Sequence, residues 1–285
     1  MTAERDGTTA IVTEILDAPL VLCAAEPGHR DGATAMQRLS RRALRALALS
    51  GSLLALLAAA GPAVSKPLFA VPEDSLVDRI HRIAFSPSIA SYSADRPRDS
   101  GTVACESLLV ARLRSAGFDV VDPATGTAIG RKLVDSLGGL FDPKSGSIDS
   151  VRAEFVRSRV IASLKEEQGA DGILYWRIVR VAASFSSGTA QWDDMKEKME
   201  KKSFLGKLAG PSYRGTVPAY SILVVIDDRT GRSLYMHRVG IAVGATLEKD
   251  RFVDRPLAEV LGDEKRNAAA VEKVLDPFCK AALRK

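Results

Sequence analysis

The stretch VPAYSILVVIDDRTGRSLYMHRVGIAV, residues 217–243, decides the fold. Two runs rich in β-branched and aromatic residues, 217–226 and 233–243, flank the polar segment 227–231. Runs of this composition favour strands, and Gly231 can supply the positive φ that a hairpin turn needs. We therefore predict an antiparallel β-hairpin. Asp227 and Asp228 could also be interpreted as paired acids, but their place in the turn favours local hydrogen bonding.

Working outward, a second strong strand pattern, GILYWRIVRV, covers residues 172–181. It follows the clearest helical pattern of the chain, residues 150–168, whose apolar face is expected to contain Val151, Phe155, Ile161 and Leu164. The other predicted strands cover 79–85 and 118–121, and the other helices cover 103–116, 127–137 and 265–283. The order predicts an α/β (α+β) fold: a single domain, residues 78–285, with a mixed sheet packed by helices, ending in a β-hairpin and a C-terminal helix.

The segment MQRLSRRALRALALSGSLLALLAAAGPAVS, residues 36–65, precedes this domain. A basic start, an uncharged Leu/Ala run and an end rich in small residues are typical of an export signal peptide. The apolar run is shorter than the roughly 20 residues that span a membrane. We therefore expect a cleaved signal, and the alternative is a retained anchor that makes the protein a membrane accessory factor.

The expected location is the periplasm or cell envelope. Paired arginines at 41–42 suit the twin-arginine route as well as the general secretory route, so the route stays open. Met36 is a natural alternative start, which makes residues 1–35 a non-native or disordered leader. Residues 66–77 are expected to form an extended linker.

The net charge of the chain limits the classes of partner that we expect. The chain has 40 Lys+Arg against 35 Asp+Glu, and its net charge of +5 is spread out instead of forming a basic stripe, so we expect no nucleic-acid partner.

The predicted domain contains Cys105 and Cys279, an even pair in an oxidising compartment. The pair is either two buried thiols or a disulfide that joins the first and last helices.

Three segments carry a family resemblance: LLVARLRSAGFDVV at 108–121, EQGADGIL at 167–174 and VVIDDRTGRSLY at 224–235. Together, in this order and spacing, they resemble the family of envelope α/β domains around CsgG, LpoB and the N-terminal domain of TolB. The resemblance implies a non-enzymatic domain that works by contact with other envelope components. We expect its partners to be envelope proteins, and a homo-oligomer is the alternative. No Cys follows the apolar run of the leader, so we do not expect a lipid anchor.

The predicted domain carries little sign of catalytic chemistry. Its histidines are His81 and His237, which fall short of the three or four ligands of a zinc site. No nucleophile elbow, phosphate loop or dinucleotide fingerprint is present, so we expect no metal, no cofactor and no catalytic residue. The alternative is an exported hydrolase or transferase with an unrecognised site.

A charged amphipathic segment covers residues 191–208 and is predicted to be helical. Its apolar stripe contains Trp192, Met195 and Met199. Beside that stripe lie three lysines, Lys198, Lys201 and Lys202. One interpretation is a helix laid on the edge of the sheet. The other is a contact element for a partner or for peripheral binding to a membrane surface.

Overall fold

The computed structural model describes residues 66–72, 75–76, 79–92, 99–142, 146–199, 214–248 and 251–283, which belong to one compact unit. The leader and the expected signal peptide, residues 1–65, lie outside the described residues. Within the described part the fold is α+β, as predicted: an eight-stranded sheet, packed by helices, with a small two-stranded sheet beside it. None of the helices in this part is both long enough and apolar enough to cross a bilayer.

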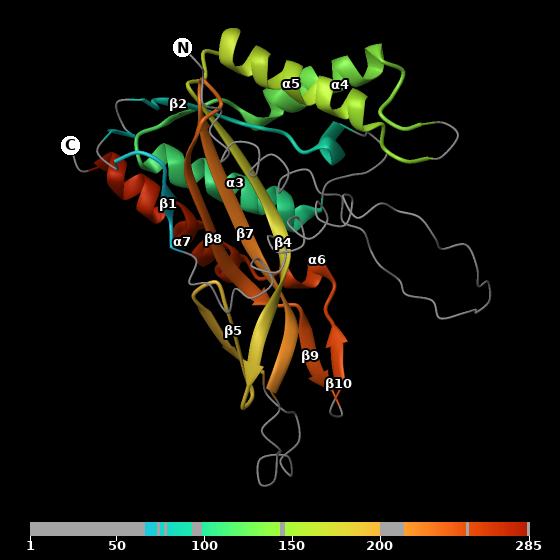
Figure 1. Cartoon of the computed structure of the whole chain (residues 1–285), viewed down its shortest axis with the longest axis vertical. Coiled ribbons are helices and arrows are strands. Elements are labelled where there is room, and N and C mark those ends of the chain that lie inside the picture. The colour runs from blue at the N-terminus through green and yellow to red at the C-terminus, as the bar shows by residue number, and fades with distance from the viewer. Residues whose placement is uncertain are drawn as a thin grey trace, which may run out of the picture. The chain divides into compact units, whose positions relative to one another are not determined.

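Three long strands form the centre of the sheet (Figure 1). They are β4 (Gly172–Ser186), β7 (Arg214–Asp228) and β8 (Ser233–Val243). β4 and β7 pair antiparallel along their whole length, and β7 and β8 form the predicted hairpin. Asp228 closes the turn, because its Oδ1 accepts hydrogen bonds from the backbone N–H groups of Thr230 and Arg232, and Gly231 has a φ of 85°. The local interpretation of Asp228 is confirmed.

The order of the sheet is β1-β8-β7-β4-β2-β3. Outside this order, β5 pairs with β4, and β6 pairs with β5. β2 (Arg82–Phe85) lies parallel to both β4 and β3 (Asp119–Val120), so the sheet is mixed, as predicted. β1 (Leu68–Phe69) pairs antiparallel with β8. The prediction that 66–77 is only a linker is therefore wrong at β1. The ring of Phe69 lies 5.1 Å from that of Tyr235, and this contact holds the segment to the sheet.

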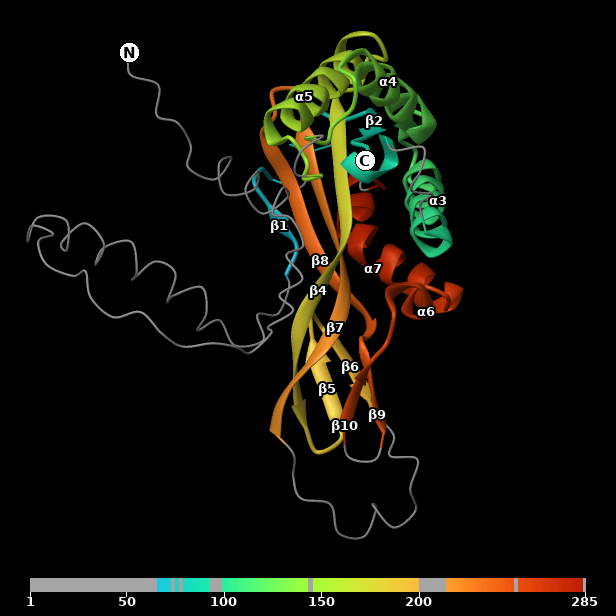
Figure 2. The same ribbon diagram turned by 90° about the vertical axis from the view of Figure 1, so that its right-hand side faces the viewer.

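Helices pack on both faces of the sheet. Figure 2 shows α3 (Ser100–Ser115), α6 (Leu257–Val260) and α7 (Glu264–Leu283) on one side of the long strands. α4 (Pro123–Ser136) and α5 (Ser150–Glu166) lie at one end, beside the short 3-10 helix η2 (Ile89–Tyr92). Aspartate side chains accept hydrogen bonds from the first backbone N–H groups of α3, α4 and α5; they are Asp99, Asp122 and Asp149.

The predicted helix over 191–208 is wrong in its described part. Residues 189–198 form a hairpin of β5 (Thr189–Trp192) and β6 (Met195–Lys198), and residues 200–213 lie outside the described residues. Asp193 and Asp194 have φ values of 37° and 60°, which make the tight turn of this hairpin. That turn places Trp192 and Met195 opposite each other on neighbouring strands. Their separation of three residues suits one face of a helix, but here it brings the two side chains together across a tight turn. The sequence prediction also missed the second short hairpin, β9 (Ala245–Glu248) and β10 (Arg251–Asp254).

Both cysteines of the domain are buried free thiols in the structure, so the disulfide interpretation is not realised there. Cys105 on α3 and Cys279 on α7 belong to the main core, and α3 packs against α7. Burial raises the pKa of both thiols to about 11, since a thiolate is poorly solvated there; nearby Asp99 adds to the effect at Cys105.

We predict that the free energy of unfolding falls as the pH rises from about 9 to about 11. In the unfolded chain the thiols ionise near their ordinary pKa of 9.0, whereas the folded state keeps both protons until about 11. At about 1.4 kcal/mol per pH unit, the loss approaches 2–3 kcal/mol per thiol. Urea denaturation at a series of pH values measures it. The C105A/C279A double variant should show a shallower slope over this range, and an unchanged slope contradicts the prediction.

Candidate interaction surface

The structure buries one of the predicted contact residues of 191–202 and partly buries two others. Trp192 is buried, and its indole Nε1 donates to the backbone oxygen of Tyr220 at 3.3 Å. Met195 and Met199 are partly buried against the same small core, which β4, β7 and β8 complete. Lys198 is exposed, while Lys201 and Lys202 lie outside the described residues. As a partner or membrane contact, Trp192 is therefore a wrong prediction, because its side chain stabilises the β5–β6 hairpin instead.

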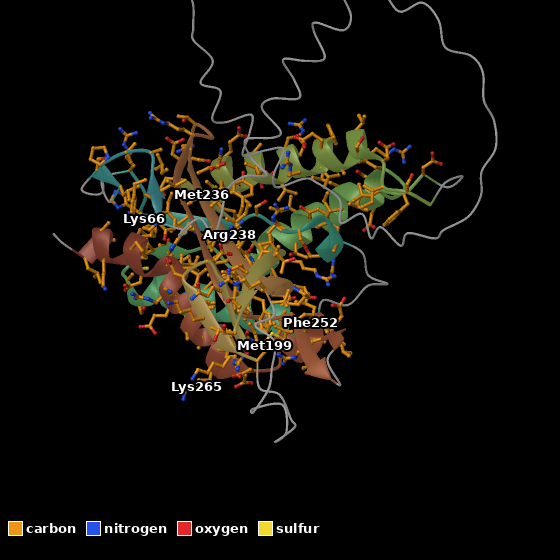
Figure 3. All side chains as sticks on the ribbon, turned by 60° about the horizontal axis from the view of Figure 1, so that its bottom comes forward. Lys66, Met199, Met236, Arg238, Phe252 and Lys265 are labelled. Carbon is orange, nitrogen blue, oxygen red and sulfur yellow. The ribbon has the colours of Figure 1, made fainter. Side chains whose placement is uncertain are left out.

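Ionic contacts attach this hairpin to the rest of the domain. The carboxylate of Asp193, 3% exposed, accepts from Arg238 at 2.7 Å and from the hydroxyl of Ser221 at 2.6 Å. On β6, the carboxylate of Glu197 pairs with Arg266 of α7 at 2.8 Å and accepts from the backbone N–H of Val243. Figure 3 labels Arg238 on β8 and Met199 just after β6. The hairpin is thus a fixed part of the fold, with its polar contacts made inside the molecule.

An exposed apolar surface lies elsewhere, at the start of α5. Four large apolar side chains contribute to it, and we call them the α5 patch: Phe141, Ile148, Val151 and Phe155, which are 39%, 48%, 78% and 45% exposed. They form two close pairs near one another in sequence, since Phe141 and Ile148 are bridge partners and Val151 precedes Phe155 by one helical turn. Large apolar side chains exposed together on one part of a surface are a feature of contact sites, which makes the α5 patch the candidate interaction surface.

One cation lies over the α5 patch. The guanidinium carbon of Arg159 is 5.8 Å from the centre of the Phe155 ring, a cation–π distance. Within the described part of the chain Arg159 has no carboxylate partner. The two neighbouring arginines of α5 are already paired, Arg152 with Asp149 and Arg157 with Glu154. The patch therefore combines an apolar surface with one positive charge that is available to a partner.

Local sequence explains why this surface stays open. The inward face of α5 is made by Ala153, Val156, Val160 and Leu164, all buried. The sequence prediction placed Val151 and Phe155 on that inward face, and the structure shows this to be wrong, because both lie on the opposite side of the helix. The sequence of α5 has two apolar stripes on different sides of the helix, one with Val156 and Val160 and one with Val151 and Phe155. Recognising both stripes could have shown that only one of them faces the core.

Metal-binding side chains are a second kind of site to consider in the described part of the chain. No group of three or more His, Cys, Asp and Glu lies close enough there to hold a metal ion. His237 is buried between strand and helix, with its Nδ1 3.1 Å from the backbone oxygen of Val274, to which the Tyr235 hydroxyl also donates. The backbone N–H of His81 bonds to Asp171. The imidazole of His237 is thus held inside the fold, whereas His81 is exposed.

The chain matches no protein-family model, and no curated protein matches it. The resemblance to the CsgG, LpoB and TolB group therefore stays a prediction from the quoted sequence segments.

Proposed function

We propose that this protein is exported to the cell envelope and acts there as a non-catalytic accessory or assembly factor that binds another envelope protein. The α5 patch is the observation that supports the proposal. The central part of a protein interface is more apolar than the rest of the surface, and phenylalanine and arginine are enriched there; the α5 patch has both. The expected signal peptide at 36–65 supports the location.

The position of the patch suits this role. It lies on the connection between α4 and α5 and on the start of α5, at one end of the long strands, away from the contacts that hold the β5–β6 hairpin (Figure 2). Its side chains are not needed for the core beneath α5, which the inward face of that helix already fills. A partner can therefore cover the patch without any rearrangement of the sheet.

Site-specific photocrosslinking in the envelope fraction tests the proposal. A photoreactive amino acid at Val151 or Phe155 should give a crosslinked adduct with a distinct protein. The same amino acid at Leu283, 60% exposed at the end of α7, is the matched control and should give none. Adducts of twice the protein's mass would identify a second copy as the partner. Equal crosslinking at all three positions, or recovery of the native protein only from cytosol, overturns the proposal.

A further inference from the structure

A groove of about 940 Å³ lies between α3 and α4, two helices that Figure 2 shows on the same side of the molecule. On α3 its wall is made by Ser107, Val110, Ala111 and Arg114. These positions are spaced i, i+3, i+4 and i+7, so they belong to one face of the helix. Three of the four residues are exposed, and Val110 is half-buried.

The wall on α4 repeats this pattern. Its residues are Ala124, Thr127, Ala128 and Arg131, with the same i, i+3, i+4, i+7 spacing. Each wall therefore has three side chains no larger than valine, followed by an arginine. Small side chains on both walls allow the backbone of a third helix to approach to the 8–10 Å that is usual between packed helices. The composition of both walls therefore suits the close packing of a helix.

The charges of the groove indicate what kind of helix it receives. Arg114 donates only to the backbone oxygen of Val120, and Arg131 only to that of Ser91, each at 3.4 Å. Neither has a carboxylate partner within the described part of the chain. Two carboxylates also line the groove and keep their charges: Asp122, whose Oδ1 accepts from the backbone N–H of Ala124, and Glu106, which has an interaction of its own. Two guanidinium groups thus keep donors for an incoming anion.

We propose that this groove binds an amphipathic α-helix of a partner protein. The small apolar side chains of that helix pack between α3 and α4, and its carboxylates pair with Arg114 and Arg131. This is helix-in-groove recognition, with the ion pairs setting the register of the bound helix. The groove shares no residue with the α5 patch, so the inference goes beyond the proposed function and does not depend on it.

A synthetic peptide is the probe. It is a stapled, fluorescein-labelled helix of about four turns, with an alanine-rich face bordered by glutamates, and its twin carries lysine in place of every glutamate. Fluorescence anisotropy with the full chain should show the glutamate peptide binding at least tenfold more tightly than the lysine peptide. The R114Q/R131Q variant should lose about tenfold in affinity for the glutamate peptide, because each ion pair is removed.

Two further variants keep the test decisive. K132Q removes an exposed charge of α4 outside the groove, and its affinity should stay unchanged. A111L/A128L fills the groove and should abolish binding, while its thermal unfolding midpoint stays that of the wild type because both positions are exposed. Equal affinity for the glutamate and lysine peptides, no binding below about 1 mM, or full binding by A111L/A128L overturns the inference.

Discussion

Replacing Asp193 by asparagine should lower the free energy of unfolding by about 2–3 kcal/mol. The substitution removes the negative charge that Arg238 and the hydroxyl of Ser221 share, in a position where the Asp193 side chain is 3% exposed. Removing one partner from a fully buried ion pair costs about 3–5 kcal/mol, and we expect less here because the side chain of Arg238 is 41% exposed. Asparagine also tolerates the positive φ of this turn, so backbone strain does not contribute.

Asp194 provides the matched control. It is the next residue of the same turn, it also has a positive φ, and it is exposed. D194N makes the same chemical change in solvent and should alter the free energy of unfolding by less than about 0.5 kcal/mol. Urea denaturation of both variants measures the two losses in the free energy of unfolding. A loss in D193N no larger than that in D194N would show that the Asp193–Arg238 pair does not hold the hairpin.

A double variant quantifies the pair itself. If the charge of Asp193 acts mainly through Arg238, then D193N/R238Q should lose less than the sum of the two single losses. The difference is the coupling energy of the two side chains, and contacts in one network typically give about 0.5–3 kcal/mol. Strict additivity would mean that the hydrogen bond from Ser221 to Asp193 carries the effect.

The V151D/F155D variant should weaken binding of the crosslinked partner by more than about a hundredfold, equivalent to about 3 kcal/mol. It places two carboxylates in the middle of the α5 patch and removes the ring beneath Arg159. Unpaired charges in an interface lose their hydration without compensation. The apolar contacts of the Val151 and Phe155 side chains with the partner are lost as well. A pull-down from the envelope fraction and titration against the purified partner measure the effect.

The same variant should leave the fold intact. Val151 and Phe155 are 78% and 45% exposed, so we expect the free energy of unfolding to fall by only about 0.5–1 kcal/mol, the value of the lost cation–π contact. L283D makes an equivalent substitution at an exposed leucine of α7 and should bind like the wild type. If L283D and V151D/F155D bind equally well, the α5 patch is not the interface.

Much of the fold could be predicted because its signals are local. The β7–β8 hairpin combines two β-branched runs with a turn whose Asp228 and Gly231 act within five residues of each other. Helices α3 and α5 begin next to a capping aspartate and have apolar residues at helical spacing. Each of these features is complete in a short window of sequence, so a pattern in that window is sufficient to predict it.

The predictions failed where the outcome depended on a distant contact. Trp192 and Met195 have a helical spacing, but they pack over Gly240 of β8, where a side chain at position 240 would meet both of them. Strand β1 exists because Phe69 reaches Tyr235, which lies far along the chain. On α5, the choice of inward face was decided by the shape of the core beneath the helix, and this choice left Val151 outside.

The sequence by itself thus determined the class of the fold, its central hairpin and its main helices, because hydrophobic period, turn residues and helix caps act over a few residues. Tertiary structure alone decided which apolar side chains became core and which became surface, and therefore where the α5 patch and the α3–α4 groove lie. The physical reason is that burial is a competition. A sheet face offers limited area, and the side chains that cover it from distant parts of the chain exclude the others.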